Sequence, residues 1–195
     1  MFELHESGLY ESDWLTCVQD ILQENNLGYI WQAQDVNVNQ TFVKNELKEQ
    51  LRSGFIIDWK AAMFHSSKCT LYKEIKTAFR LEPYLYKVPK STWRFIVKFR
   101  CSNHKLPIET GRYGNVERQM RHCQKCNSMV LGDEYHIFFK CDNTDIVSLR
   151  RRFVPLYFQL NRNHSMYNFV RLMKMVDDVK VARQISSFIK FCDIM

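Results

Sequence analysis

Three cysteines and one histidine give the strongest constraint on what this chain can fold into. Two residues separate Cys123 from Cys126, and His136 and Cys141 follow, in the pattern C-x2-C-x9-H-x4-C. A C-x2-C pair can turn back on one ion. Zn²⁺ takes four such ligands in a tetrahedron, with sulfur at about 2.3 Å and imidazole nitrogen at about 2.0–2.1 Å. The spacing therefore predicts one zinc ion per chain, held by Cys123, Cys126, His136 and Cys141.

Two residues between the ligand pairs favour this closure. Gly132 permits the chain reversal that returns the second pair to the first, and Asp133 is placed to cap a short helix that carries His136. Because four protein ligands leave no open coordination position, we expect a structural zinc site rather than a catalytic one.

Other ligand sets remain open at this point. Cys101 and His104 form a C-x2-H pair that could join Cys123 and Cys126 instead, and His122 lies beside the first pair. The predicted set closes the shorter loop, which costs less entropy. The remaining cysteines stand alone in apolar, helical surroundings, where we expect buried and unreactive thiols: Cys17, Cys69 and Cys192.

Helical periodicity dominates the rest of the sequence. Apolar residues make up 46% of the chain, enough for a buried core, and they recur at intervals of three and four. We expect an all-α, helical bundle-like domain with a small irregular zinc-binding insert, in which any strands are two short ones around the cysteines. The expected helices cover 12–25, 41–65, 69–80 and 90–101, with three more after Cys141, the last capped by Asp177 or Asp178.

Several segments interrupt this periodicity. Tyr29 and Trp31 indicate a short apolar connector, and Pro83 and Pro89 bracket an expected loop, since proline lacks an amide donor. Residues 102–119 lose the helical period and predict a loop-rich approach to the cysteines. The expected organisation is one compact unit made of an N-terminal helical region (1–101), a zinc-binding module (102–145) and C-terminal helices (146–195).

Charge is distributed unevenly along the chain. Residues 1–50 carry two basic and nine acidic side chains, whereas residues 51–195 carry 26 basic and 12 acidic ones. A field of one sign favours a polyanionic partner, usually nucleic acid. Lys90, Arg94 and Lys98 repeat every fourth residue and predict a cationic ridge on one helix. The candidate phosphate contacts are Lys90, Arg94, Lys98, Lys105, Arg112, Arg150, Arg151 and Arg152.

The residues around the cysteines resemble a known family. The stretch from Lys98 to Arg112 contains Leu106-Pro-Ile-Glu-Thr-Gly-Arg112. Cys123-Gln-Lys-Cys126, Gly132-Asp-Glu-Tyr-His136 and Cys141 follow it. This arrangement resembles the zinc-binding region that follows the polymerase in non-LTR retrotransposon reverse transcriptases, where a basic helix and a similar loop precede the cysteines. The resemblance is specific over about residues 95–141, is looser elsewhere, and implies the same four zinc ligands.

The resemblance also implies a function. The chain looks like the detached carboxy-terminal module of such an enzyme, without polymerase or endonuclease. We therefore expect a non-catalytic accessory domain that binds RNA or DNA, with other retroelement proteins as further partners. No segment reaches the roughly 18 apolar residues of a membrane span, and the amino terminus is acidic rather than signal-like, so we expect an intracellular protein without a membrane partner, in the nucleus or cytoplasm.

Two other functions remain open. A protein-interaction or scaffold module would use zinc for folding alone and would neutralise the cationic ridge with the acidic residues of 1–50. A small metal-dependent nuclease would use Asn103, His104 and Glu134, but a closed four-ligand site has no place for a nucleophilic water.

Overall fold

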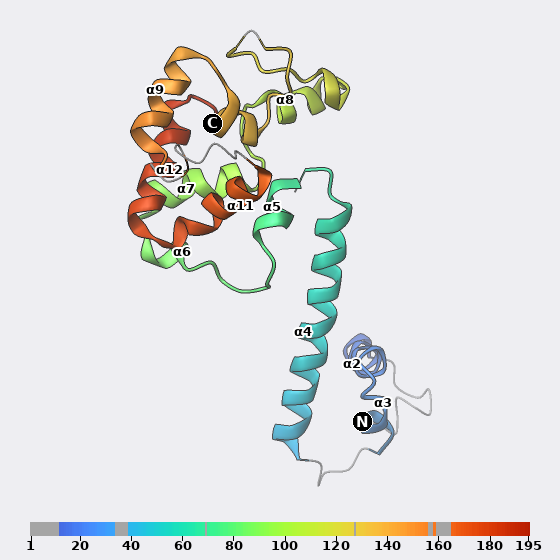
Figure 1. The fold of residues 1–195 in the computed structure, drawn as a ribbon. Coiled ribbons are helices and arrows are strands. Elements are labelled where there is room, and N and C mark those ends of the chain that lie inside the picture. The colour runs from blue at the N-terminus through green and yellow to red at the C-terminus, as the bar shows by residue number, and fades with distance from the viewer. Residues whose placement is uncertain (1–11, 34–38, 69, 127, 156–157, 159–164) are drawn as a thin grey trace. The chain divides into compact units, whose positions relative to one another are not determined.

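The described residues of this computed structural model are 12–33, 39–68, 70–126, 128–155, 158 and 165–195. They form helices joined by turns, and the β-pairing among them is one isolated antiparallel bridge between His122 and Leu131 (Figure 1). The prediction of an all-α fold is confirmed, and the expected strands around the cysteines are reduced to that bridge. Within these ranges, no helix combines the length and the apolar character needed to cross a membrane.

The chain divides into two units, Met1–Ala62 and Met63–Met195, and the division falls inside the long helix α4 (Gln40–His65). The boundary expected at residue 101 lies within the second unit. The expected zinc-binding module (102–145) and the C-terminal helices therefore share one unit with the preceding basic helix.

The first unit has a small core built from α2 (Asp13–Glu24), α3 (Gly28–Ala33) and part of α4. Leu15, Leu22 and Trp31 are buried there, and Leu47 of α4 packs against them. The connector predicted around Trp31 is wrong, because a helix occupies this segment. A helix of six residues makes fewer than two turns, too few to show a period in the sequence. None of the 26 residues of α4 is buried.

The second unit holds the larger core. Its helices begin with α5 (Thr70–Ile75), α6 (Tyr84–Lys87), α7 (Lys90–Arg100) and α8 (Pro107–Tyr113). After the 3-10 turn η1 (Arg118–Met120) and the π-helical turn η2 (His136–Lys140) come α9 (Thr144–Phe153), α11 (Met166–Lys174), the 3-10 turn η3 (Met175–Asp177) and α12 (Val179–Phe191). Helix α12 packs against both α7 and α9.

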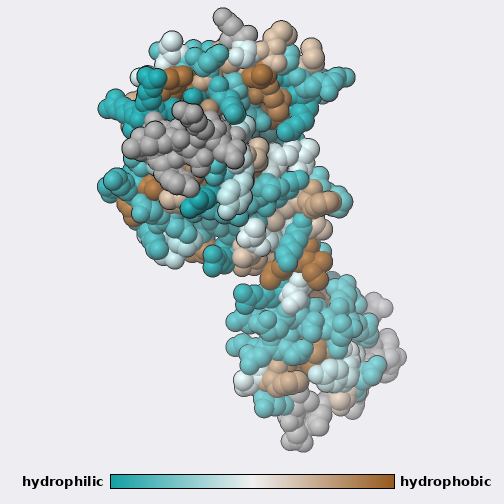
Figure 2. All heavy atoms as spheres, in the orientation of Figure 1, coloured by the Kyte–Doolittle hydropathy of each residue, from teal (hydrophilic) through white to brown (hydrophobic). Residues whose placement is uncertain are grey.

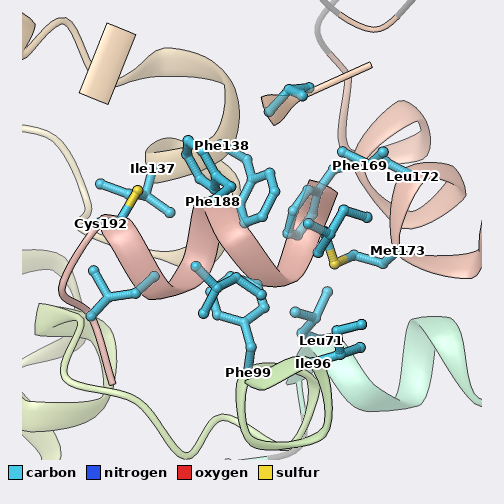
Figure 3. Close-up of a cluster of buried hydrophobic side chains, with 14 of the residues drawn as sticks. Leu71, Ile96, Phe99, Ile137, Phe138, Phe169, Leu172, Met173, Phe188 and Cys192 are labelled. Carbon is cyan, nitrogen blue, oxygen red and sulfur yellow. The ribbon is translucent and has the colours of Figure 1, made fainter. Parts of the chain in front are cut away.

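Aromatic side chains from four elements fill the centre of this unit (Figure 3). The ring of Phe138, on η2, lies 4.4 Å from that of Phe188 on α12, 5.4 Å from that of Phe99 on α7, and 5.6 Å from that of Phe169 on α11, measured between centroids. All four rings are at most 1% exposed. The segment that carries His136 is therefore anchored directly in the hydrophobic core.

Three expectations for the elements of the second unit are wrong: the end of one helix and two segments expected to lack helix. Helix α5 ends at Ile75, because Lys76 turns inward and donates to the Arg80 carbonyl and to the Glu82 carboxylate. A short helix, α6, replaces the loop expected between the prolines. Helix α8 occupies part of the irregular stretch, with Pro107 in its first turn, where a missing amide donor costs nothing.

Buried charges connect these early elements. Arg100 is 2% exposed, donates to Glu82 at 3.2 Å and lies over the Tyr84 ring. The Glu82 carboxylate also bonds Lys76 at 2.5 Å. Burial raises the pKa of Glu82, but Lys76 and Arg100 outweigh that effect and leave the pKa below its usual value.

Polar side chains cover much of the visible surface (Figure 2).

Candidate metal centre

The structure brings together the four residues that the cysteine spacing predicts. One ligand atom each from Cys123, Cys126, His136 and Cys141 lies within 4.8 Å of all the others, and the Sγ of Cys126 is 3.3 Å from the Nε2 of His136. Ligand atoms around one tetrahedral zinc ion stand about 3.5–3.8 Å apart, given its usual bond lengths. Cys126 is half-buried and the other three are buried. The group could hold a metal ion.

The first ligand pair is held by backbone contacts across the isolated bridge. The Cys123 amide donates to the Val130 carbonyl at 2.9 Å, and the Gly132 amide donates to the Arg121 carbonyl at 2.9 Å. A Cβ at Gly132 would lie 2.9 Å from the Cα of Cys123 and 2.9 Å from the Cγ of Pro107. Only a glycine at position 132 allows the backbone to approach Cys123, the first residue of the C-x2-C segment, this closely.

The second ligand pair is placed by a capped π-helical turn. The Oδ1 of Asp133 accepts a hydrogen bond from the His136 amide at 2.8 Å, which confirms the predicted cap. The Cys141 amide then donates to the His136 carbonyl at 2.8 Å, closing a five-residue turn. That turn brings Cys141 back beside His136 and explains the x4 spacing.

Asn143 and Arg150 connect the candidate metal centre to α9. The sequence did not assign either residue to this site. Asn143 caps α9 by accepting from the amides of Asp145 and Ile146, and its Nδ2 donates to the carbonyl of Lys125 at 2.7 Å, inside the C-x2-C knuckle. Arg150 donates to the Cys141 carbonyl at 2.8 Å. An Asn before a helix predicts such a cap. Nothing in the sequence predicts the hydrogen bond from Asn143 to the Lys125 carbonyl.

Burial and nearby groups shift the pKa values of Cys126, His136 and Cys141. Burial raises the pKa of the Cys141 thiol to about 12. Burial also raises the pKa of Cys126, but hydrogen bonds from Ser128 bring it below its usual value. Burial, followed by the charge of Arg150, lowers the pKa of His136 and keeps its imidazole neutral and able to ligate. Ligation would require the three cysteines as thiolates, and a bound cation would offset their mutual repulsion.

The alternative ligand sets are separated from this group. The Nε2 of His104 is 2.9 Å from the Oε1 of buried Glu134, and its Nδ1 accepts from the Leu106 amide at 3.4 Å. Both ring nitrogens are thus engaged elsewhere. Among the described residues, neither Cys101 nor His122 belongs to the four-ligand group.

The predicted phosphate contacts differ in how the structure places them. Exposed cations are Lys90, Arg94, Lys98, Lys105, Arg151 and Arg152. Arg112 is partly buried and donates to Glu109 at 3.0 Å and to Ser67 at 3.1 Å. Arg150 is partly buried and its Nη2 donates to the carbonyls of Ile137 and Cys141, so the structure gives it a structural contact, while the phosphate contact stays a prediction.

The structure confirms the predicted burial for some cysteines outside the cluster and not for others. Cys192 is 2% exposed and lies in the core (Figure 3), as predicted. Cys17 is exposed on α2, so the prediction of a core thiol is wrong there. Its position falls on the polar side of that helix, opposite buried Leu15 and Leu22. Cys69 lies outside the described residues.

Comparison with known proteins leaves the site to be interpreted from its own chemistry. The chain matches no protein-family model, no curated protein and no solved structure. The donor set, its burial and the charge of the surrounding unit therefore carry the functional argument.

Proposed function

We propose that this chain is a zinc-stabilised, non-catalytic nucleic-acid-binding module of the cell interior, similar to the carboxy-terminal part of non-LTR retrotransposon reverse transcriptases. The observation that carries the zinc assignment is the convergence of three thiols and a neutral imidazole within 4.8 Å. Zinc would be held by Cys123, Cys126, His136 and Cys141. These four protein ligands satisfy a tetrahedral ion, which supports a structural role rather than a catalytic one.

The charge of the second unit supports a polyanionic partner. Residues 63–195 carry 24 basic and 11 acidic side chains, a net of +13, whereas residues 1–62 carry a net of −6. Among the described residues, three of the 11 carboxylates are paired with a basic side chain: Glu82 with Lys76 and Arg100, Glu109 with Arg112, and Glu134 with His104. The cations left at the surface include the ridge of Lys90, Arg94 and Lys98 on α7.

Metal analysis tests the zinc assignment. We expect about one zinc ion per purified chain, and a lower thermal midpoint when a chelator removes it, because binding energy of a structural zinc ion is folding energy. Cys123→Ser and Cys141→Ser should each lose zinc. Cys17→Ser is the matched control, since Cys17 is exposed on a helix of the other unit. Folded wild-type protein without metal would contradict the assignment.

Salt titration tests nucleic-acid binding. We expect affinity for labelled duplex DNA and single-stranded RNA to fall steeply between about 50 and 200 mM salt. Replacing the ridge residues Lys90, Arg94 and Lys98 with Gln should reduce the slope of log K against log salt by up to about 2.7 on duplex DNA. A matched variant replaces Lys44, Lys48 and Arg52 with Gln, which removes the same charge at the same spacing from α4.

The matched pair separates this proposal from the scaffold alternative. If net charge alone attracts nucleic acid, the two triple variants lose equal affinity. If the ridge is the contact surface, only the α7 variant loses it. Weak association that is insensitive to salt, with zinc still required for folding, would favour the protein-interaction module.

A further inference from the structure

Two phenylalanine rings form a parallel stack at the surface of the second unit, where α9 and α12 lie side by side (Figure 1). Phe153 ends α9 and Phe191 ends α12. Their ring planes differ by 5° and their centroids are 5.5 Å apart, which is an offset stack. Phe191 is 57% exposed. One helix terminus thus presents a large aromatic surface to solvent, supported from behind by a second ring.

A cation accompanies each ring of this stack. The guanidinium of Arg152 lies 5.1 Å from the Phe153 centroid, and the ammonium of Lys190 lies 5.9 Å from the Phe191 centroid. Both cations are exposed, and so is Arg151. Within two residues of Phe153 or Phe191 along the chain stand three basic residues, Arg151, Arg152 and Lys190, and one acidic residue, Asp193.

We propose that the Phe153–Phe191 stack, with Arg152 and Lys190, is a platform on which an unpaired base of single-stranded RNA or DNA stacks. This inference rests on the proposed nucleic-acid-binding function and locates part of it. Every base has a π-face, so an exposed ring can bind it without sequence preference, and adjacent cations neutralise the flanking phosphates. Bases in a duplex are already stacked and cannot use the platform.

Substitutions at Phe191 in the full-length chain test the platform. Binding would be measured for labelled oligo(U), oligo(dT) and a mixed-sequence duplex at one salt concentration. Phe191→Ala should weaken binding of both single strands about tenfold and leave duplex binding unchanged. Phe191→Leu keeps an apolar contact with Phe153 but lacks a π-face, so it should also lose affinity. Phe191→Trp should retain it.

Tyr113→Ala is the matched control, because Tyr113 is 80% exposed on the same unit and ends α8. It should leave all three affinities unchanged. Single-strand binding that survives Phe191→Ala, while the wild type still binds nucleic acid, would overturn the platform and leave the proposed function standing. In that case the two rings would serve to pack α9 against α12, or would form a contact for a protein. A wild type that binds none of the three probes would overturn both.

Discussion

Replacing Gly132 with alanine should destabilise the candidate metal centre, because backbone atoms close the space beside this glycine. The added Cβ would lie 2.9 Å from the Cα of Cys123, 2.9 Å from the Cγ of Pro107 and 3.0 Å from the amide nitrogen of Cys123. Carbon atoms in contact prefer about 3.5–4.0 Å, so the chain must open by about 0.5 Å or more. Because backbone atoms of Cys123 block the methyl group, no side-chain rotation can relieve the overlap.

The expected cost is about 2–3 kcal/mol, the upper part of the range for overpacking. That corresponds to a fall of roughly 6–9 °C in the thermal midpoint of a unit of this size. Thermal unfolding of the zinc-loaded protein, followed by circular dichroism, measures it. Competition with a chromophoric chelator should show about tenfold weaker zinc binding, because the substitution displaces a ligand-bearing segment.

Gly114→Ala is the matched control for this change. A Cβ at Gly114 would have its nearest neighbour at 3.7 Å, which is an ordinary contact. This variant should therefore stay within about 0.5 kcal/mol of the wild type. Equal midpoints for the Gly132 and Gly114 variants would refute the close approach between the returning strand and the knuckle.

Two further substitutions test the packing of each unit. Glu82→Gln should cost about 3 kcal/mol at neutral pH, because it leaves Lys76 and Arg100 buried without a counter-charge. Since the folded-state pKa of Glu82 is lowered, its contribution is present above the unfolded pKa of about 4.3 and is lost as pH falls through the folded value. Denaturant titrations of both proteins should therefore converge at acidic pH, and a constant difference would contradict the role of the carboxylate. Gly54→Ala should stabilise α4 by about 0.5–1 kcal/mol, because its Cβ would meet nothing within 4 Å. Slower amide exchange in α4 would confirm this, and faster exchange would contradict it.

The sequence predicts long helices well and short elements poorly, for physical reasons. Helices α4, α7 and α12 contain several turns and begin where predicted to within a residue, and Asp178 caps α12 by accepting from the amides of Lys180 and Val181. Helices α3, α6 and α8 contain at most seven residues, so tertiary packing rather than periodicity stabilises them. The inward turn of Lys76 ended α5 early, and that turn depends on Glu82, a partner six residues further on.

The metal centre shows the same division between local and tertiary information. The four ligands follow from spacing, because a C-x2-C knuckle and a five-residue turn are local structures that one ion can join. The residues that hold those turns in place do not follow from spacing. Asn143 and Arg150 reach metal-centre carbonyls 18 and nine residues away, and each looks like an ordinary cap or surface cation in the sequence. In the sequence, Arg150, Arg151 and Arg152 are equally good candidates for a phosphate contact. Only the fold shows that Arg150 donates to the Cys141 carbonyl and is partly buried, whereas Arg151 and Arg152 are exposed.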